Sequence, residues 1–501
     1  MANTVRITAS DGSTVEFVDD IAAQGGMKDV YFSPDRSYVV AFFRDPQDSN
    51  ARDRLENIVG SYRTKIFDQA GGEYWRDMYC WPTKIVEHDG RLGIVAPTYH
   101  KHFFFEHGSI NGDILNIRGK DKEGKWFASA HHRAKFLDPK ELGNWRSYLT
   151  TCIKIARAVK RMHAAGLAHS DLSYKNVLVD PTGGNACIID IDGLVVPGKF
   201  PPDVVGTPDF IAPEVLATSH LPLADKNRAL PRIETDRHAL SVLIYMYLLY
   251  RHPLRGSKVH DADPQKDEML SMGNQALFVE HPTDASNRPK TDGLKPSYLP
   301  WADVTKVPYK TTGPYLKELF DRAFIEGLHA PNKRPTADDW ERALVKTVDL
   351  LQPCGNPSCQ QEWYVFDNST KPVCPFCGTA YRGLLPVLNL YSKRGNKKFM
   401  PDNHRLMVYS NQYLYRWHAN RRIFPNERIS AADKTPVGYF VLHGGRWVFV
   451  NQTLPSLKDV SGENPEPIAT NAMVELKDDQ KLLLSDEDGG RLVHVQMVDC
   501  G

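Results

Sequence analysis

The sequence predicts an α+β protein of several successive domains, and three observations support this. Short strand-like runs fill the first 100 residues, and the segment 142–165 then has the apolar spacing of a long amphipathic helix. Four cysteines between residues 354 and 377 have the spacing of a small metal-binding unit. From Leu384 onward, strand-like runs separated by turns predict an all-β domain, either a sandwich or a barrel.

The composition is that of an ordinary globular protein, because the net charge is only +1 and there is no polybasic run. We therefore expect neither nucleic acid nor a membrane as a partner. The longest apolar run, residues 239–250, is too short to span a bilayer and predicts a buried helix. The first residues contain no apolar signal segment, so we expect a cytoplasmic protein.

The first 100 residues predict a small lobe that begins with a β-hairpin. Turn residues at 10–12 separate its two strands, and Gly25 and Gly26 open a later loop. Residues 52–69 carry apolar side chains at helical spacing. The predicted strands are 5–8, 14–18, 30–33, 38–43, 81–88 and 91–97.

The pattern around Asp171, with Asn176 five residues later and Asp190 fourteen beyond that, is the most informative in the chain. Asp171 can accept a proton, while Asn176 and Asp190 offer the oxygen atoms that Mg²⁺ prefers. Apolar runs at 177–179 and 187–189 predict two short strands between these residues. The pattern resembles the catalytic loop and metal-binding segment of protein kinases.

The resemblance implies ATP as the phosphate donor and Mg²⁺ as a cofactor. It implies that Asp171 is the catalytic base and that Asn176 and Asp190 bind magnesium. It covers about residues 15–350 and is to eukaryotic-like Ser/Thr kinases, so it implies a bilobal protein-kinase-like fold. The small lobe with its leading hairpin would be residues 1–100 and the large lobe residues 101–352.

Later motifs follow in the family's order. The segment ending in Ala-Pro-Glu214 resembles the end of an activation segment, with Thr207 at a position that lines the substrate site. Asp236 is similar to the Asp that anchors the catalytic loop. Arg334 is similar to the Arg that pairs with the activation-segment Glu, so we expect an Arg334–Glu214 ion pair.

Several residues depart from the family pattern. Ser170 stands where most regulated kinases have the Arg that receives a phosphate of the activation segment, so we expect activity without that phosphorylation. Ser173 replaces a phosphate-contacting Lys, and Lys175 can supply the transition-state charge instead. The D-L-S-x-x-N form also resembles Rio-type atypical kinases. Asp192, two residues after the metal-binding Asp, is either a helper in the site or a turn residue.

The expected lysine of the third strand is missing. Such kinases place it two residues after an Ala that faces adenine. If Ala41 is that Ala, strand alternation puts Phe43 at the lysine position and turns Arg44 to the opposite face. A bulge or a one-residue register shift is the alternative, and it would return the role to Arg44.

The preceding loop offers another cation, Lys28, which follows Gly25 and Gly26. With Val30 at the position of the loop valine, this arrangement resembles the with-no-lysine kinases, whose phosphate-binding Lys comes from the nucleotide loop. The resemblance implies that the two glycines and Lys28 bind the phosphates. It also implies an acid partner on the following helix, which we assign to Glu56. The alternative is an inactive kinase in which Lys28 is a solvated loop charge.

Residues 353–383 predict a zinc ribbon. Its ligands would be Cys354, Cys359, Cys374 and Cys377, and the last pair lies in a C-P-F-C-G segment that resembles a zinc knuckle. Four thiolates leave no open coordination position, so the zinc would be structural. We expect metal, rather than a hydrophobic core, to hold so short a unit together. The alternative, two disulfides, is disfavoured in a reducing compartment.

Residues 384–501 predict a β-sandwich-like domain with a distant similarity to forkhead-associated domains. The phosphate-binding signature of that family, Gly-Arg and Ser-x-x-His, is missing. Loose candidates for phosphopeptide contacts are Arg416, Arg421, Arg422 and Ser430. The alternative is a β domain that binds no phosphopeptide.

The order of kinase, four-cysteine unit and β-rich tail resembles the kinase of bacterial tellurite-resistance-associated triads. That resemblance implies a von Willebrand A protein as substrate and a metal-dependent protein phosphatase as antagonist. We therefore expect a protein Ser/Thr kinase in a bacterial stress-response module. The alternative is a pseudokinase scaffold that binds partners through its zinc and β modules. A small-molecule kinase is disfavoured by the Gly-Thr…Ala-Pro-Glu segment.

Overall fold

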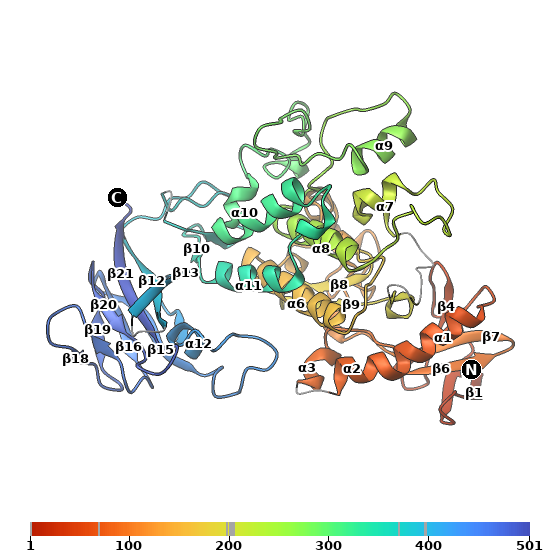
Figure 1. Cartoon of the computed structure of the whole chain (residues 1–501), viewed down its shortest axis with the longest axis horizontal. Coiled ribbons are helices and arrows are strands. Elements are labelled where there is room, and N and C mark those ends of the chain that lie inside the picture. Colours follow the sequence, from red (N-terminus) through yellow and green to blue (C-terminus); the bar gives the residue numbers. More distant parts are fainter. Residues whose placement is uncertain (1–2, 69–70, 197–198, 200–205, 369–370, 395–397) are drawn as a thin grey trace. The chain divides into compact units, whose positions relative to one another are not determined.

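The computed structural model describes residues 3–68, 71–196, 199, 206–368, 371–394 and 398–501 (Figure 1). The chain divides into two units. The first comprises Met1–Gly143, Ser147–Pro308 and Leu319–Glu341, and the second Asn144–Arg146, Tyr309–Glu318 and Arg342–Gly501. None of the described helices combines the length and the apolar character needed to cross a membrane.

The first unit begins with a hairpin and a five-stranded antiparallel sheet of order β3-β4-β5-β7-β6. Because side chains alternate along β5, Val40 and Phe42 pack on one face of the sheet with Phe17 of the hairpin, while Ala41 packs on the other face with Leu55. The strands are β1 (Thr4–Thr8), β2 (Thr14–Val18), β3 (Ala23–Gln24), β4 (Lys28–Phe32), β5 (Tyr38–Phe43), β6 (Lys84–His88) and β7 (Arg91–Pro97).

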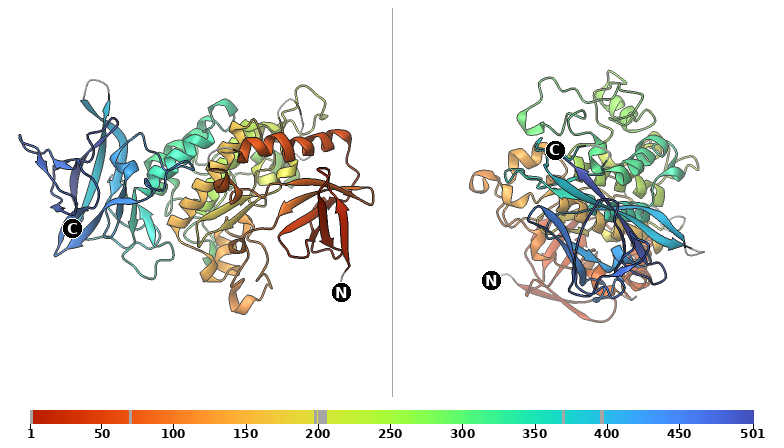
Figure 2. Two further views of the ribbon diagram at one scale, coloured as in Figure 1. Left: turned by 90° about the horizontal axis from the view of Figure 1, so that it is seen from below. Right: turned by 90° about the vertical axis from the view of Figure 1, so that its left-hand side faces the viewer.

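One long helical segment lies beside this sheet (Figure 2, left). The Asp48 side chain accepts a hydrogen bond from Ala51 N at 2.8 Å, and this N-cap starts the helix three residues before the predicted residue 52. A π-helical turn interrupts it in the middle. The segment consists of α1 (Ser49–Asn57), η1 (Ile58–Tyr62) and α2 (Arg63–Phe67), and α3 (Gly72–Arg76) follows.

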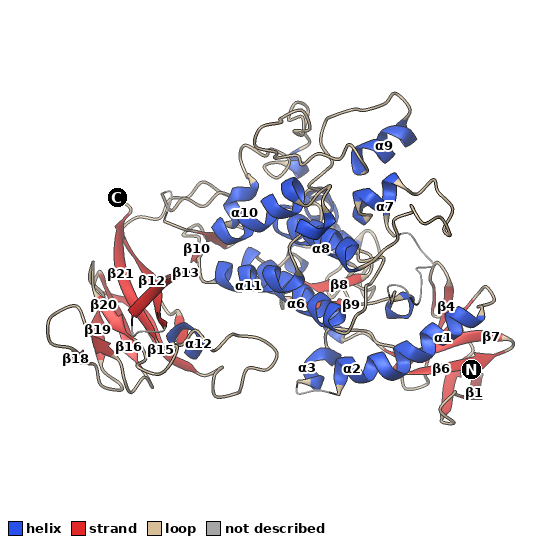
Figure 3. Cartoon of the chain, viewed as in Figure 1, coloured by secondary structure: helices blue, strands red, loops and turns tan. Residues whose placement is uncertain are grey.

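Helices dominate the chain between residues 101 and 348 (Figure 3). The predicted helix 142–165 is α6 (Trp145–Ala164), and the apolar run 239–250 lies in α8 (Ile233–Leu249), which is buried from Ala239 to its end. The hairpin of β8 (Val177–Asp180) and β9 (Asn185–Ile188) follows the Asp171 loop, as predicted. The other α-helices are α4 (Ile110–Asp113), α5 (Ala130–Phe136), α7 (Pro213–Ala217), α9 (Pro264–Met272), α10 (Pro314–Asp321) and α11 (Ala337–Val348).

Short helical turns connect these elements. The π-helical turn η9 (Arg322–Glu326) continues α10. The 3-10 turns are η2 (Lys101–Phe103), η3 (Gly124–Trp126), η4 (Pro139–Glu141), η5 (Ile191–Gly193), η6 (Pro208–Phe210), η7 (Pro296–Tyr298), η8 (Tyr309–Thr312) and η10 (Pro331–Lys333).

The second unit is rich in β-sheet, as predicted. Its two larger sheets have the orders β13-β12-β21-β20-β17-β18 and β14-β15-β16-β19, and all their pairings are antiparallel. A short pair, β10 (Leu351–Pro353) and β11 (Trp363–Val365), precedes them, and α12 (Arg416–Ala419) follows β14. The strands are β12 (Leu384–Arg394), β13 (Lys398–Met407), β14 (Tyr413–Tyr415), β15 (Pro436–His443), β16 (Arg446–Asn451), β17 (Lys458–Asp459), β18 (Glu466–Pro467), β19 (Met473–Glu475), β20 (Lys481–Leu483) and β21 (Arg491–Asp499).

The cysteine segment shares a hydrophobic core with these sheets. Cys374 and Tyr364 are buried in the same cluster as Val387, Phe440 and Val495. This differs from our expectation that metal, rather than a core, holds the segment together. The sequence of the segment alone does not show the apolar surface that the later strands bring to it.

Candidate active site

The loop that carries Asp171 is anchored from α8. The buried carboxylate of Asp236 accepts hydrogen bonds from His169 N at 2.7 Å and Ser170 N at 3.3 Å. His163 Nε2 lies 3.1 Å from the same carboxylate. The predicted anchoring by Asp236 is therefore present. Ser170 has a left-handed φ of 66°, a strained conformation that this anchoring helps to maintain.

The Asp171 carboxylate is held from two sides. Asn176 Nδ2 donates to the backbone oxygen of Asp171 at 2.8 Å and to its Oδ2 at 2.9 Å. Thr207 N donates to Oδ1 at 2.6 Å. Because Asn176 uses its NH₂ group in this way, its amide oxygen is the atom that can bind a cation. Thr207 Oγ1 is buried against Ser173 Oγ at 3.2 Å.

The backbone of Asn176 is joined to the segment that carries Asp190. The Ile189 N–H donates to the Asn176 carbonyl oxygen at 3.0 Å, which joins the two segments directly before Asp190. Asp190 has φ 61° and ψ 41°, a left-handed conformation that is uncommon for residues other than glycine. Its side chain is 49% exposed and makes an ion pair with Lys28. The segments that carry the two predicted magnesium ligands are thus paired through their backbones, and both side chains offer oxygen atoms.

Lys28 lies at the first position of β4 and is paired in register with Phe43 of β5. Its Nζ lies 5.3 Å from the centre of the Phe43 ring, 2.6 Å from Asp192 Oδ2 and 3.2 Å from Asp190 Oδ1. Burial lowers the pKa of the Lys28 ammonium, but the two carboxylates outweigh burial and hold that pKa above its ordinary value. Lys28 therefore stays charged beside the site.

Arg44 contacts the glycine loop instead. Its guanidinium donates to the carbonyl oxygens of Gly25 and Gly26, and its Nε lies 3.9 Å from Asp29. Gly25 N donates to Lys28 O at 2.9 Å and closes the turn between β3 and β4. The structure thus places Arg44 against the loop backbone and Lys28 against the two aspartates.

Val30, Ala41 and Glu56 are the other residues that the sequence analysis assigned to the nucleotide site. Val30 and Ala41 are register partners on β4 and β5, and both contact the cluster that contains Phe43. Glu56 is exposed on α1 and has no ion pair with Lys28 among the described residues. The prediction that Glu56 pairs with Lys28 is therefore wrong, because Asp192 and Asp190 are the partners of Lys28.

A pocket lies beside Asp171. Gly206, Thr207, Ile211 and Pro231 line it. Gly206 has φ 113°, and a Cβ there would lie 3.3 Å from the Ser170 carbonyl oxygen, so glycine allows the close approach of the two segments. Lys175 is exposed and forms none of the ion pairs found among the described residues.

The predicted Arg334–Glu214 pair is present and bidentate. Arg334 Nη1 lies 2.9 Å from Oε1 and Nη2 lies 2.7 Å from Oε2, and the Arg334 side chain is fully buried. Arg334 also donates to three backbone carbonyls, including that of Gly327. The pair fixes the end of the activation segment.

Sequence reasoning missed a polar cluster next to this segment. Tyr174 Oη donates to Asp209 Oδ2 at 3.1 Å, and Arg255 forms ion pairs with both Asp209 and Glu268. Asp209 lies within the motif before Ala-Pro-Glu, but Arg255 and Glu268 lie much later in the chain, outside any motif noted above. No motif connects residues so far apart in sequence.

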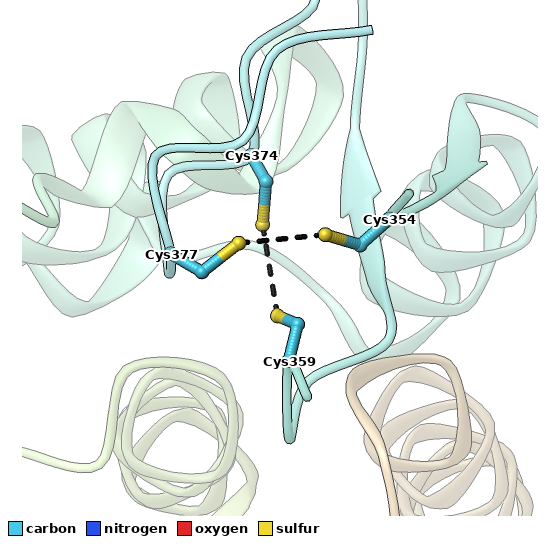
Figure 4. Close-up of side chains that lie close together, drawn as sticks. All are labelled: Cys354, Cys359, Cys374 and Cys377. Atoms are coloured by element: carbon cyan, nitrogen blue, oxygen red, sulfur yellow. Dashed lines mark hydrogen bonds between the residues drawn. The ribbon is translucent and has the colours of Figure 1, made fainter. Parts of the chain in front are cut away.

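The four cysteines come together in the second unit (Figure 4). Their sulfur atoms all lie within 4.8 Å of one another. Cys354 Sγ and Cys377 Sγ are 3.4 Å apart, and Cys359 Sγ and Cys374 Sγ are 3.9 Å apart. These distances exclude disulfides, whose sulfurs are about 2.05 Å apart. Two sulfurs bound to one tetrahedral zinc lie about 3.8 Å apart, so the group fits such an ion.

Hydrogen bonds favour the thiolate at the exposed member of this group. Burial raises the pKa of the Cys377 thiol, but hydrogen bonds with Thr379 and Cys354 outweigh it and lower that pKa to about 6. Gly378 follows with φ 77°, and its N–H donates to Cys374 O at 2.9 Å. The backbone thus makes the tight turn that two ligands separated by two residues need.

Comparison with known proteins finds matches to protein kinases in part of the chain. The sequence model of the protein kinase domain matches residues 128–340. Calcium-dependent protein kinase 6 of Oryza sativa subsp. japonica is 31% identical over 127 residues, 22% of this chain and 21% of that protein. Serine/threonine-protein kinase PknD of Chlamydia felis is 29% identical over 148 residues, 24% of this chain and 14% of that protein. The matched part is thus about a fifth or less of each relative.

Among solved structures, ROP2 of Toxoplasma gondii, described as a virulence factor with a protein-kinase fold and no enzymatic activity, aligns with a TM-score of 0.39 at 14% identity. That alignment covers 69% of this chain and 85% of that chain. The family match, together with the Asp171, Asn176 and Asp190 geometry, shows that the chain contains a protein kinase domain with a kinase-like fold.

Proposed function

Since the chain contains a protein kinase domain, we propose that it is an ATP- and magnesium-dependent kinase that phosphorylates Ser or Thr of a protein partner. Two observations carry this proposal: Asn176 holds the Asp171 carboxylate, and the charged Lys28 contacts Asp190, whose segment is hydrogen-bonded to Asn176. A scaffold without chemistry needs none of these four groups.

Asp171 would act on the attacking hydroxyl. The substrate oxygen forms a bond to the γ-phosphorus, the bond from that phosphorus to the oxygen of ADP breaks, and the hydroxyl proton passes to the Asp171 carboxylate. Asn176 and Thr207 hold that carboxylate in one orientation, so it needs no reorganisation during the reaction.

Asn176 and Asp190 would hold magnesium, because their segments are paired through the backbone and they offer an amide oxygen and a half-exposed carboxylate. The ion would neutralise charge on the phosphates. Lys28, on β4, would bind the phosphates. The backbone of Gly25 and Gly26 would approach the same phosphates. Lys175, which is exposed, would add a positive charge near the phosphate during transfer.

The substrate would enter the pocket lined by Gly206 and Thr207. From the resemblance to tellurite-resistance-associated triads, we infer a von Willebrand A protein as the substrate and a metal-dependent phosphatase as the antagonist, within a cytoplasmic stress-response module. Zinc would occupy the four-cysteine group in a structural role. Two of the candidate phosphopeptide contacts in the β domain, Arg416 and Arg422, pair with Asp433 and Asp488, which leaves them less suited to bind phosphate.

Transfer of labelled γ-phosphate to a protein tests the proposal. The wild-type chain should label a von Willebrand A protein on Ser or Thr in the presence of magnesium, and Asp171→Asn should lose this labelling by about a thousandfold or more. Equal labelling by both would show a contaminating kinase. No labelling by the wild type, with partner binding intact, would favour the scaffold.

A further inference from the structure

The two aspartates that contact Lys28 have different environments. Asp192 Oδ2 lies 2.6 Å from Lys28 Nζ, and these two side chains are 8% and 17% exposed. Asp190 Oδ1 lies 3.2 Å from the same nitrogen, and its side chain is 49% exposed. Lys28 therefore has a close, buried partner and a more distant, open one. Two carboxylates in such different surroundings suit two different roles.

The helix beside the sheet offers Lys28 no acid. The residues that α1 buries are Ala51, Arg54 and Leu55, while its acids Asp53 and Glu56 are exposed. The charged side chain that α1 turns inward is thus an arginine, which has the same sign as Lys28. A partner for the ammonium must come from another segment.

The acid next to Lys28 in sequence is also engaged elsewhere. Asp29 is buried, and its Oδ2 lies 2.7 Å from Arg91 Nη2. Strand alternation turns its side chain to the face of β4 opposite that of Lys28. Among the described residues, the carboxylates that pair with Lys28 are therefore those of Asp190 and Asp192.

The backbone explains how both aspartates reach one nitrogen. Asp190 is left-handed, and the 3-10 turn Ile191–Gly193 follows directly. Ile191 is 1% exposed and points into the core between the two acids. The turn thus presents residues 190 and 192 on the same side, toward Lys28.

We propose that Asp192 is the positioning residue that holds Lys28 toward the nucleotide phosphates, while Asp190 is left to bind magnesium. This rests on the proposed function, because it needs ATP in the site. A divalent ion and an ammonium compete for Asp190. When the ion binds there, Lys28 keeps Asp192 as its partner and stays in place, in the role that an acid of the small-lobe helix would otherwise have.

Nucleotide binding, measured without turnover, separates the two roles. A fluorescent ribose-labelled ATP is titrated into the full chain, once with magnesium and once with a chelator, and the ratio of the two Kd values gives the magnesium enhancement. Asp190→Asn should reduce this ratio to about one. Asp192→Asn should keep the ratio within roughly twofold of wild type but weaken binding in both conditions by roughly tenfold. Asp192→Glu should recover part of that loss.

Two results would overturn the inference. Wild-type binding by Asp192→Asn would show that Lys28 needs no such partner, and loss of the magnesium enhancement in Asp192→Asn, with retention in Asp190→Asn, would exchange the roles. A wild-type chain that binds no labelled ATP would overturn the proposed function and this inference with it. If the wild type binds labelled ATP but the magnesium enhancement depends on Asp192 and not on Asp190, only this inference is overturned.

A double variant covers the case in which Asp192→Asn does not fold. Lys28→Met with Asp192→Asn removes both charges, and loss of a whole buried pair is tolerated better than loss of one member. If Asp192 acts through Lys28, the double variant should bind labelled ATP as Lys28→Met does. A further tenfold loss would show that Asp192 acts on the nucleotide independently of Lys28.

Discussion

Arg334 and Glu214, 120 residues apart, form a bidentate ion pair in which the arginine side chain is fully buried. The pair ties the end of the activation segment to the turn before α11. Glu214→Gln would leave the buried guanidinium without its charge partner. We expect the free energy of unfolding of the first unit to fall by about 3–5 kcal/mol, measured by chemical denaturation.

Arg322→Gln is the matched control for this change. Arg322 lies 3.4 Å from Asp339, with both side chains about one-third exposed. Its loss should change the free energy of unfolding by less than about 1 kcal/mol. Equal effects of the two substitutions would mean that the burial of Arg334 does not make its ion pair more important for the free energy of unfolding.

Lys28 and Arg44 should differ in their importance for catalysis. Lys28 faces Asp190 and Asp192, whereas Arg44 donates to the carbonyls of the glycine loop. Lys28→Met should reduce ATP turnover by about a hundredfold or more, on the order of 3 kcal/mol of transition-state stabilisation. Arg44→Met should keep most of the activity. The reverse ranking in steady-state assays would return the phosphate-binding role to Arg44.

Activity should not require a phosphate on the activation segment. Thr207 is buried, its hydroxyl contacts Ser173 Oγ, and Ser170 offers no positive charge to receive a phosphate. Protein treated with a phosphatase should keep its full rate, and mass spectrometry should find Thr207 unmodified in the active form. An inactive protein that is switched on by phosphate at Thr207 would contradict this.

Metal removal should destabilise the second unit. We expect about one zinc per chain by elemental analysis, and Cys374→Ser should lose it and lower the free energy of unfolding of this unit by more than about 3 kcal/mol. Cys500→Ser changes a cysteine outside the four-sulfur group and should keep the metal. A metal content unaffected by Cys374→Ser would rule out this site.

The second unit should also weaken in acid because of Asp349. His404 Nε2 lies 2.6 Å from its Oδ2 and His418 Nε2 lies 3.2 Å from its Oδ1. Burial raises the pKa of Asp349, but the two histidines outweigh burial and hold that pKa well below its ordinary value. A carboxyl whose pKa is lowered on folding stabilises the folded state above its unfolded pKa of about 3.9, and this stabilisation is lost as the pH falls below that value.

Asp349→Asn should therefore lower the free energy of unfolding by about 1–3 kcal/mol near neutral pH. The difference from wild type should shrink as the pH falls below about 4. Denaturant titrations followed by tryptophan fluorescence at several pH values measure it. A difference that stays constant with pH would show that the charge of Asp349 does not stabilise the fold.

Contacts between residues close in sequence could be predicted from the sequence. Contacts that depend on how distant helices and strands face each other could not. Asp171 and Asn176 are five residues apart on one loop, so their contact follows from the motif. The partner of Lys28 depends on which face of α1 turns inward and on the left-handed conformation of Asp190. Side-chain spacing alone gives neither, so it points to Glu56 as the partner of Lys28 and does not decide whether Asp192 is a helper in the site or a turn residue.

The four-cysteine segment and the two larger sheets share one hydrophobic core, and this limits how evolution can rearrange the chain. Cys374 and Tyr364 are buried in the same cluster as Val387 and Val495. A recombination event that joined another protein at residue 384 would separate the cysteine segment from the sheets. The apolar side chains that now pack between these two parts would then be exposed to solvent. The segment and the sheets should therefore be inherited together, as a single cassette.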